Sequence, residues 1–241
     1  MPPKSVLIDD IAENKDAWQV LLVIADLKNY NHAMDSTPAI ERLLKAANSS
    51  TEGDTSVNFA KRVFLEQSEC DAFFELTCSH LLDISEWNKH SSATGYELFN
   101  QNGVVTSEPI SVGAFIRIAL YGSGKYDWVR VISILDEADE FVLTVKPSWD
   151  PTNAPIDPDS ISHFFGPEAV NNFCVQRIGK TVAFYVIGLD EHQNTRFTDG
   201  LIESARNAAV ANVGYYSGLQ KAVWKQFASN FLESDDKEED R

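Results

Sequence analysis

The tetrapeptide Gly-Ser-Gly-Lys at residues 122–125 is the stretch of the chain that most resembles a nucleotide-binding loop. A P-loop has the pattern Gly-x-x-x-x-Gly-Lys-Ser/Thr, in which backbone amides surround the phosphates and a hydroxyl binds magnesium. With Gly124 and Lys125 in place, the first glycine of the pattern falls on Ala119 and the hydroxyl position falls on Tyr126. The segment that follows alternates like a strand, whereas a P-loop opens a helix. We therefore predict a hairpin loop here and no nucleotide site.

The two strands that this loop joins carry arginines that could bind an anion. The segments FIRIAL and WVRVISIL both alternate with a period of two residues. If Leu120 pairs with Asp127, then Arg117 lies opposite Arg130, and facing like charges are destabilising unless an acid or an anion lies between them. Two alternatives remain open: an anion-binding pair inside a sheet-lined cavity, or arginines that face solvent or pair with carboxylates of nearby strands. A register shift of one residue would separate the two side chains.

Three further side chains are candidates for the wall of a ligand pocket. Trp128 and Trp149 lie near the ends of predicted elements, where an aromatic side chain either caps a core or lines a pocket. His163, in the segment ISHFF, either serves a pocket or packs on the two phenylalanines that follow it. Together with Arg117 and Arg130, these residues form the predicted ligand site.

Motifs for metal binding and catalysis are not recognised in the sequence. The five histidines form no HExxH motif, and we identify no other ligand pair with Cys, Asp or Glu at helical or hairpin spacing. No Gly-x-Ser-x-Gly elbow is present, and the aspartates of the proline-rich segment lack the EF-hand order. We expect no catalytic residue, no metal and no cofactor, and the sequence favours a binding protein over an enzyme.

Composition limits the partners and the location of the protein. The chain has 241 residues, of which 44% are hydrophobic, enough for a folded core. Its net charge of -16 disfavours nucleic acid and anionic membranes, because phosphate neutralisation requires clustered Lys and Arg. Three cysteines without CxxC spacing are typical of a reducing compartment, and no run approaches the roughly 18 apolar residues of a membrane span. We therefore expect a cytoplasmic protein that binds neither nucleic acid nor membranes.

The periodicity of the sequence divides the chain into three parts. Helical spacing over residues 7–30, and again from residue 37, predicts an N-terminal helical extension at residues 1–50. Residues 57–233 are predicted to form one α+β domain, and residues 234–241 an acidic disordered tail.

Within the α+β domain, a helix over residues 69–82 is followed by about six to eight strands. These strands must be antiparallel, because their connections are too short for parallel crossovers. A hairpin turn is expected at Asn102-Gly103, a strong signal for this geometry. The segment over residues 147–165 contains four prolines and is expected to be a long loop. Helices return after residue 195 and are interrupted by the sequence GYYSG at residues 214–218.

The order of these elements resembles the START-like helix-grip fold over about residues 58–233. The segment FFELTCSHLLDISEWNKHS looks like the early helix of that superfamily, ending in a turn in which Trp87 takes the place of its tryptophan. The phrases YDWVRV and ISHFF also look like those of uncharacterised bacterial proteins. The resemblance implies a sheet that grips the last helix, with a cavity between them that commonly holds an apolar ligand. It carries over no catalytic residue, and the interrupted C-terminal helix and the extra N-terminal helices depart from it.

Two kinds of function follow from these observations. The first is a non-enzymatic binding protein that holds a small apolar or anionic ligand between the sheet and the C-terminal helix. The alternative is a protein interaction module, such as an acidic adaptor or inhibitor, which the net charge and the extra N-terminal helices favour. An enzyme of unfamiliar type is the third hypothesis.

Overall fold

A computed structural model describes residues 6–7, 37–49, 55–91, 94–120, 126–153, 161–163, 165–192 and 223–233. Several predictions lie outside these residues: most of the first N-terminal helix, the loop at residues 121–125, the GYYSG interruption and the acidic tail. The structure places Leu7 in a short strand, so the predicted helix does not begin at residue 7.

The centre of the fold is one eight-stranded sheet in which every neighbouring pair is antiparallel. The strand order is β1-β2-β8-β7-β6-β5-β4-β3, so β3 to β8 form a meander and β2 joins its far edge. The strands are β1 (Val6–Leu7), β2 (Ser56–Val63), β3 (Thr94–Phe99), β4 (Phe115–Leu120), β5 (Tyr126–Asp136), β6 (Glu140–Pro147), β7 (Val170–Ile178) and β8 (Thr181–Leu189).

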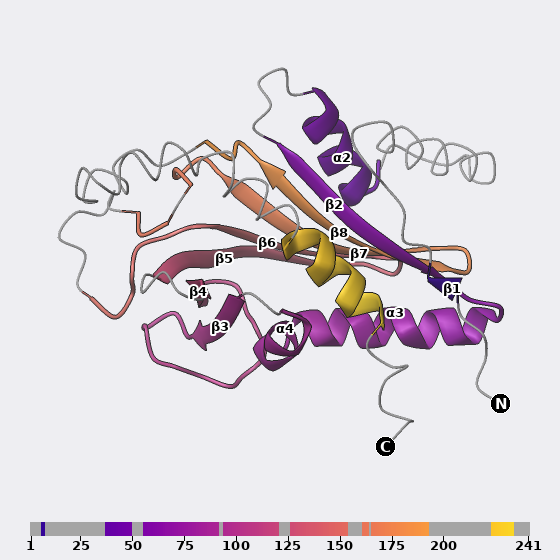
Figure 1. The fold of residues 1–241 in the computed structure, drawn as a ribbon, viewed down its shortest axis with the longest axis horizontal. Helices are drawn as coiled ribbons and strands as arrows, with labels where there is room; N and C mark the ends of the chain where they lie inside the picture. The colour runs from indigo at the N-terminus through magenta and orange to yellow at the C-terminus, as the bar shows by residue number, and fades with distance from the viewer. Residues whose placement is uncertain are drawn as a thin grey trace.

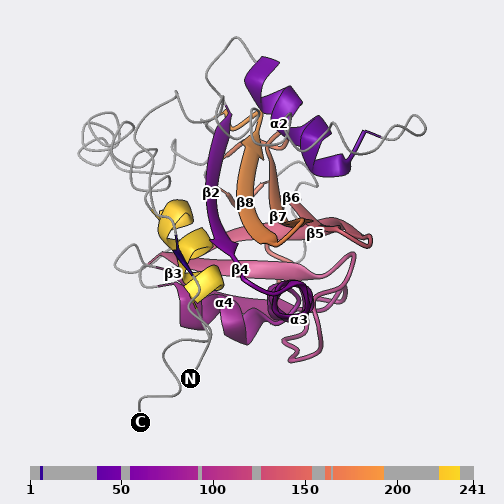
Figure 2. The ribbon, with the colours of Figure 1, turned by 90° about the vertical axis from the view of Figure 1, so that its right-hand side faces the viewer.

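Helices cover the two faces of the sheet unequally. The helices are α2 (Ala39–Ser49), α3 (Gln67–Leu81), α4 (Ile84–His90) and a C-terminal helix at residues 223–233. The sheet lies between α2 on one side and α3 with α4 on the other, and it curls strongly (Figures 1 and 2). We call the face that packs with α3, α4 and the C-terminal helix the inner face, and the opposite face the outer face.

The alternation of strand residues explains the two faces. Leu143, Phe173 and Phe184 point into the large inner core with the aromatic residues of the helices. Their neighbours Val142 and Cys174 pack instead on α2, in a smaller outer core. Because both faces are covered, β6, β7 and β8 are buried along most of their length and show no simple alternation of exposure.

A buried carboxylate holds α2 on the outer face. Glu140, at the start of β6, accepts hydrogen bonds from the Ala39 backbone N–H at 2.7 Å and from Gln176 Nε2 at 3.0 Å. Negative charge at a helix N-terminus is favourable because the first N–H groups have no partner within the helix. Burial raises the pKa of Glu140, and the hydrogen bonds it accepts oppose that rise.

The predicted fold class is confirmed: an α+β protein with an antiparallel meander, helices before it and a helix against its inner face. The second N-terminal helix, expected from residue 37, begins at Ala39 and packs on β2, β6 and β8. The division of the chain into an extension, a domain and a tail stays a prediction.

Candidate functional site

The C-terminal helix is seated on the inner face by one apolar stripe. Its buried side chains recur at helical spacing, and they are Trp224, Phe227, Ala228, Phe231 and Leu232. Phe227 lies at the centre, with its ring centroid 4.7 Å from Phe231, 5.5 Å from Trp87 and 6.1 Å from Phe173. Aromatic rings from α4, β7, β8 and the C-terminal helix therefore meet between sheet and helix.

A buried arginine fixes the last turn of this helix. Arg62 Nη1 donates a hydrogen bond to the Leu232 carbonyl at 3.1 Å, and the guanidinium lies 4.7 Å from the centre of the Phe73 ring. A cation at a helix C-terminus satisfies carbonyl groups that have no partner in the helix. Arg62 thus holds the end of the C-terminal helix by a charged hydrogen bond, in addition to the apolar packing of the helix.

The α4 helix contacts the C-terminal helix from the other side. Asn230 Nδ2 donates to the His90 carbonyl at 2.8 Å, and the His90 ring lies 4.6 Å from the ring of Phe231. Trp87 is fully buried and donates from Nε1 to the Leu81 carbonyl at 3.0 Å, which closes the turn between α3 and α4. The helix is therefore held by β2, α4 and the sheet together.

The indole N–H of Trp224 has no hydrogen-bond acceptor among the residues that the structure describes. This N–H is buried, and the Trp224 ring lies 5.3 Å from Phe173 and 5.6 Å from Phe227. An unsatisfied buried N–H costs about 1–3 kcal/mol, and such groups in native proteins call for an explanation.

Three of the predicted ligand residues, Arg117, Trp128 and Arg130, lie elsewhere, on the outer face. The register supposed for these strands, which places Arg117 opposite Arg130, is not the observed one, because Arg117 lies opposite Trp128 and Phe115 lies opposite Arg130. The register differs by two residues, which keeps the two arginines on the same face but removes their direct opposition. The adjacent residues Ile116 and Val129 point into the inner core. Arg117, Trp128 and Arg130 therefore do not line the inner face.

The two arginines have different surroundings. Arg117 forms an ion pair with Glu97 of β3 at 2.5 Å, and its guanidinium lies 4.4 Å from the centre of the Tyr126 ring. This is the second predicted alternative, in which a neighbouring carboxylate balances the charge. The Arg130 side chain is exposed and lies over the Phe115 ring at 5.4 Å.

Of the remaining predicted residues, Trp128 and Trp149 pack with Phe99 and Phe115, and His163 lies next to the residue that bonds to the Trp128 backbone. Trp128 is buried against Phe99 at 4.8 Å, and Trp149 lies 5.7 Å from Phe115. His163 follows Ser162, whose carbonyl accepts a hydrogen bond from the Trp128 N–H at 2.9 Å. The Nδ1 atom of His163 accepts a hydrogen bond from the Phe165 N–H at 2.9 Å, and burial lowers the pKa of His163 to about 4. Packing with Phe99 and Phe115 explains why the Trp128 side chain is buried, and no ligand is needed to account for it.

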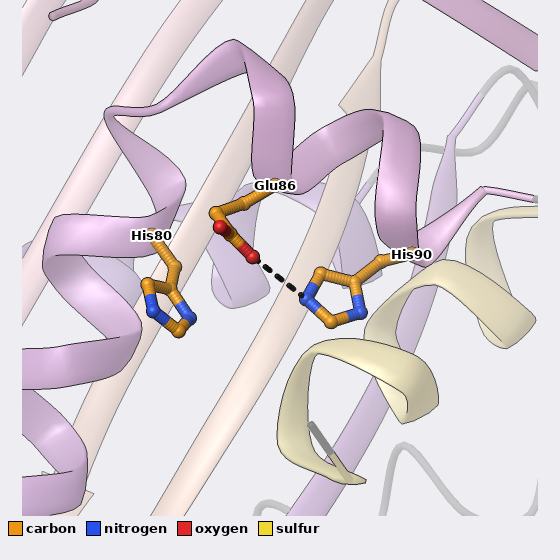
Figure 3. Close-up of side chains that lie close together, drawn as sticks. All are labelled: His80, Glu86 and His90. Carbon is orange, nitrogen blue, oxygen red and sulfur yellow. Dashed lines mark ion pairs between the residues drawn. The ribbon is translucent and has the colours of Figure 1, made fainter. Parts of the chain in front are cut away.

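The sequence interpretation missed one cluster of side chains. His80, Glu86 and His90 place one ligand atom each within 4.8 Å of one another (Figure 3). The statement that no histidine pairs with an acid at helical spacing was wrong, because Glu86 and His90 are four residues apart on α4. The four-residue spacing of Glu86 and His90 could have been recognised in the sequence. The position of His80 beside them could not, because it depends on the turn between α3 and α4.

The curled antiparallel sheet with the C-terminal helix on its inner face is the arrangement that the helix-grip resemblance implied. A hypothetical protein from Helicobacter pylori is similar at 17% identity and a TM-score of 0.44, covering 79% of this chain and 98% of that one. Major latex-like protein 151 from Panax ginseng is similar at 15% identity and a TM-score of 0.35, covering 74% and 96%. A protein from Arthrobacter aurescens is similar at 11% identity and a TM-score of 0.38, covering 75% and 92%.

No protein-family model and no curated protein sequence matches the chain. Among the helices that the structure describes, none is long and apolar enough to cross a membrane.

Proposed function

We propose that the chain is a non-enzymatic binding protein that holds a small, flat, apolar ligand between the sheet and the C-terminal helix. The observation that carries this proposal is the buried Trp224 N–H, for which no described residue supplies an acceptor. A ligand that offers one acceptor atom at this position removes the cost of the unsatisfied group. The ligand lies at the Trp224 edge of the aromatic cluster, near the start of the described part of the helix.

The surroundings of Trp224 select the chemistry of the ligand. The nearest rings, Phe173 and Phe227, offer faces and edges that favour stacked or edge-to-face contact with another aromatic ring. A charged ligand would lose its hydration on entering this cluster, whose buried core residues are hydrophobic. We therefore favour a neutral carbonyl compound over the anionic ligand that the sequence left open.

The outer-face residues belong to a separate surface in this proposal. Arg117, Trp128 and Arg130 lie on the opposite side of the sheet from the C-terminal helix, so they serve as controls for binding at Trp224. We further propose a cytoplasmic location, which the three buried cysteines, all unpaired, support.

The test compares a flat aromatic ketone with its parent hydrocarbon, 9-fluorenone and fluorene, by intrinsic fluorescence titration. We expect wild-type protein to bind fluorenone saturably, and Trp224→Phe, which keeps a ring but removes the N–H, to bind it about 5–10-fold more weakly. Fluorene should bind wild type and Trp224→Phe equally, because it has no acceptor. Trp128→Phe and Arg130→Ala should leave the affinity for fluorenone unchanged.

Two outcomes would reject the proposal. One is the absence of saturable fluorenone binding to wild type up to the solubility limit. The other is an equal loss of affinity in Trp224→Phe and Trp128→Phe, which would indicate binding that does not depend on the inner face.

A further inference from the structure

Three side chains at the junction of α3 and α4 have the composition of a transition-metal site. His80 comes from the last turn of α3, and Glu86 and His90 come from successive turns of α4. One ligand atom from each lies within 4.8 Å of the others, and Glu86 Oε2 lies 3.7 Å from His90 Nε2. Figure 3 shows the three side chains turned toward one another.

We propose that His80, Glu86 and His90 bind a divalent transition-metal ion, with Zn²⁺ the best fit. Two imidazole nitrogens and one carboxylate oxygen are a common ligand set for zinc, and three protein ligands leave a fourth tetrahedral position open for water. Zinc holds such ligands at about 2.0–2.2 Å, so tetrahedral ligand atoms are about 3.3 Å apart. The separation between Glu86 and His90 is close to that spacing, and small side-chain rotations bring in His80.

The surroundings of the cluster are compatible with a cation. The Glu86 side chain is only 12% exposed, and a positive ion compensates the desolvation of its carboxylate. Lys89 Nζ contacts Glu86 Oε1 at 2.5 Å from the exposed side, which leaves Oε2 directed to His90.

The site lies beside the C-terminal helix, which gives metal binding a structural consequence. The His90 ring packs on Phe231, and the His90 carbonyl accepts the hydrogen bond of Asn230. A metal ion that fixes His90 joins α3 to α4 and restrains the surface on which the C-terminal helix rests. Bound metal therefore stabilises the native state through linkage.

The test is calorimetric titration of Zn²⁺ into the metal-free full-length chain, with thermal melts alongside. Wild type should bind one Zn²⁺ per chain and melt at a higher temperature when zinc is present. His80→Ala and Glu86→Gln should each weaken binding by more than about 100-fold, because loss of an outer-shell partner alone costs about 10–100-fold. His192→Ala, an exposed histidine outside the cluster, should bind like wild type.

The variants are chosen so that folding does not confuse the result. His80 and Glu86 are only partly buried, so their variants should retain the circular dichroism spectrum of wild type, whereas His90 supports the packing of Phe231. Unchanged zinc affinity in both variants would overturn the proposal, and so would a wild-type chain that binds no stoichiometric zinc. Tetrahedral cobalt absorption in wild type that disappears in His80→Ala would support it.

Discussion

Replacing Phe227 with alanine should lower the free energy of unfolding by about 3–5 kcal/mol, the usual cost of removing a fully buried phenylalanine. The side chain is 1% exposed and contacts aromatic rings from α4, β3, β7, β8 and its own helix. These rings come from separate elements, so they cannot close the cavity without moving the elements themselves. The loss is a large part of the roughly 5–15 kcal/mol that stabilises an ordinary domain.

Urea denaturation followed by circular dichroism measures this effect, and the same helix supplies the control. Lys225 is exposed, so Lys225→Ala should change the free energy of unfolding by less than about 0.5 kcal/mol. If Phe227→Ala were no more destabilising than Lys225→Ala, the C-terminal helix would not be docked on the inner face.

Acidification should remove about 3 kcal/mol of stability through His163 between pH 6.5 and pH 4. Burial lowers the pKa of His163 to about 4 in the folded chain, against about 6.5 in the unfolded chain. Between these values the unfolded chain binds the proton and the folded chain does not, so the free energy of unfolding falls as pH falls. The contribution is fully present above pH 6.5 and is lost as the pH approaches 4.

The variant His163→Asn isolates this contribution from the carboxylates that titrate in the same range. Asparagine keeps an acceptor for the Phe165 N–H but takes up no proton. The difference in unfolding free energy between wild type and His163→Asn should therefore change with pH by about 3 kcal/mol between pH 7 and pH 4. A difference that stays constant over this range would mean that His163 is accessible to protons in the folded state.

Local patterns in the sequence were sufficient for the fold class. Period-two alternation and short connections identify the antiparallel meander, because strand pairing across tight turns depends on neighbouring residues. The Asn102-Gly103 turn is confirmed by the Gly103 φ of 74° and by the Asn100 N–H bond to the Val104 carbonyl at 2.8 Å. The spacing of Trp224, Phe227 and Phe231 in the sequence likewise fits the buried stripe of the C-terminal helix.

Contacts between residues far apart in the sequence could not be predicted from those local patterns. The register of β4 and β5 depends on which apolar residues face the inner core, so an assumed pairing of Leu120 with Asp127 failed by two residues. The partner of Arg62 lies 170 residues away, and the lack of an acceptor for the Trp224 indole N–H among the described residues depends on what surrounds it in space. Glu86 and His90 were within reach of sequence reasoning, but His80 joins them only because the chain turns at Asp83.

The most direct test of ligand binding at Trp224 is the indole N–H signal of that residue in ¹⁵N-edited NMR spectra. Its assignment follows from the signal that disappears in Trp224→Phe. Titration with 9-fluorenone should shift this signal in the direction of a newly formed hydrogen bond and leave the Trp128 indole signal, on the outer face, in place. An unmoved Trp224 signal at saturating fluorenone, or equal shifts of the Trp224 and Trp128 signals, would contradict the proposed site.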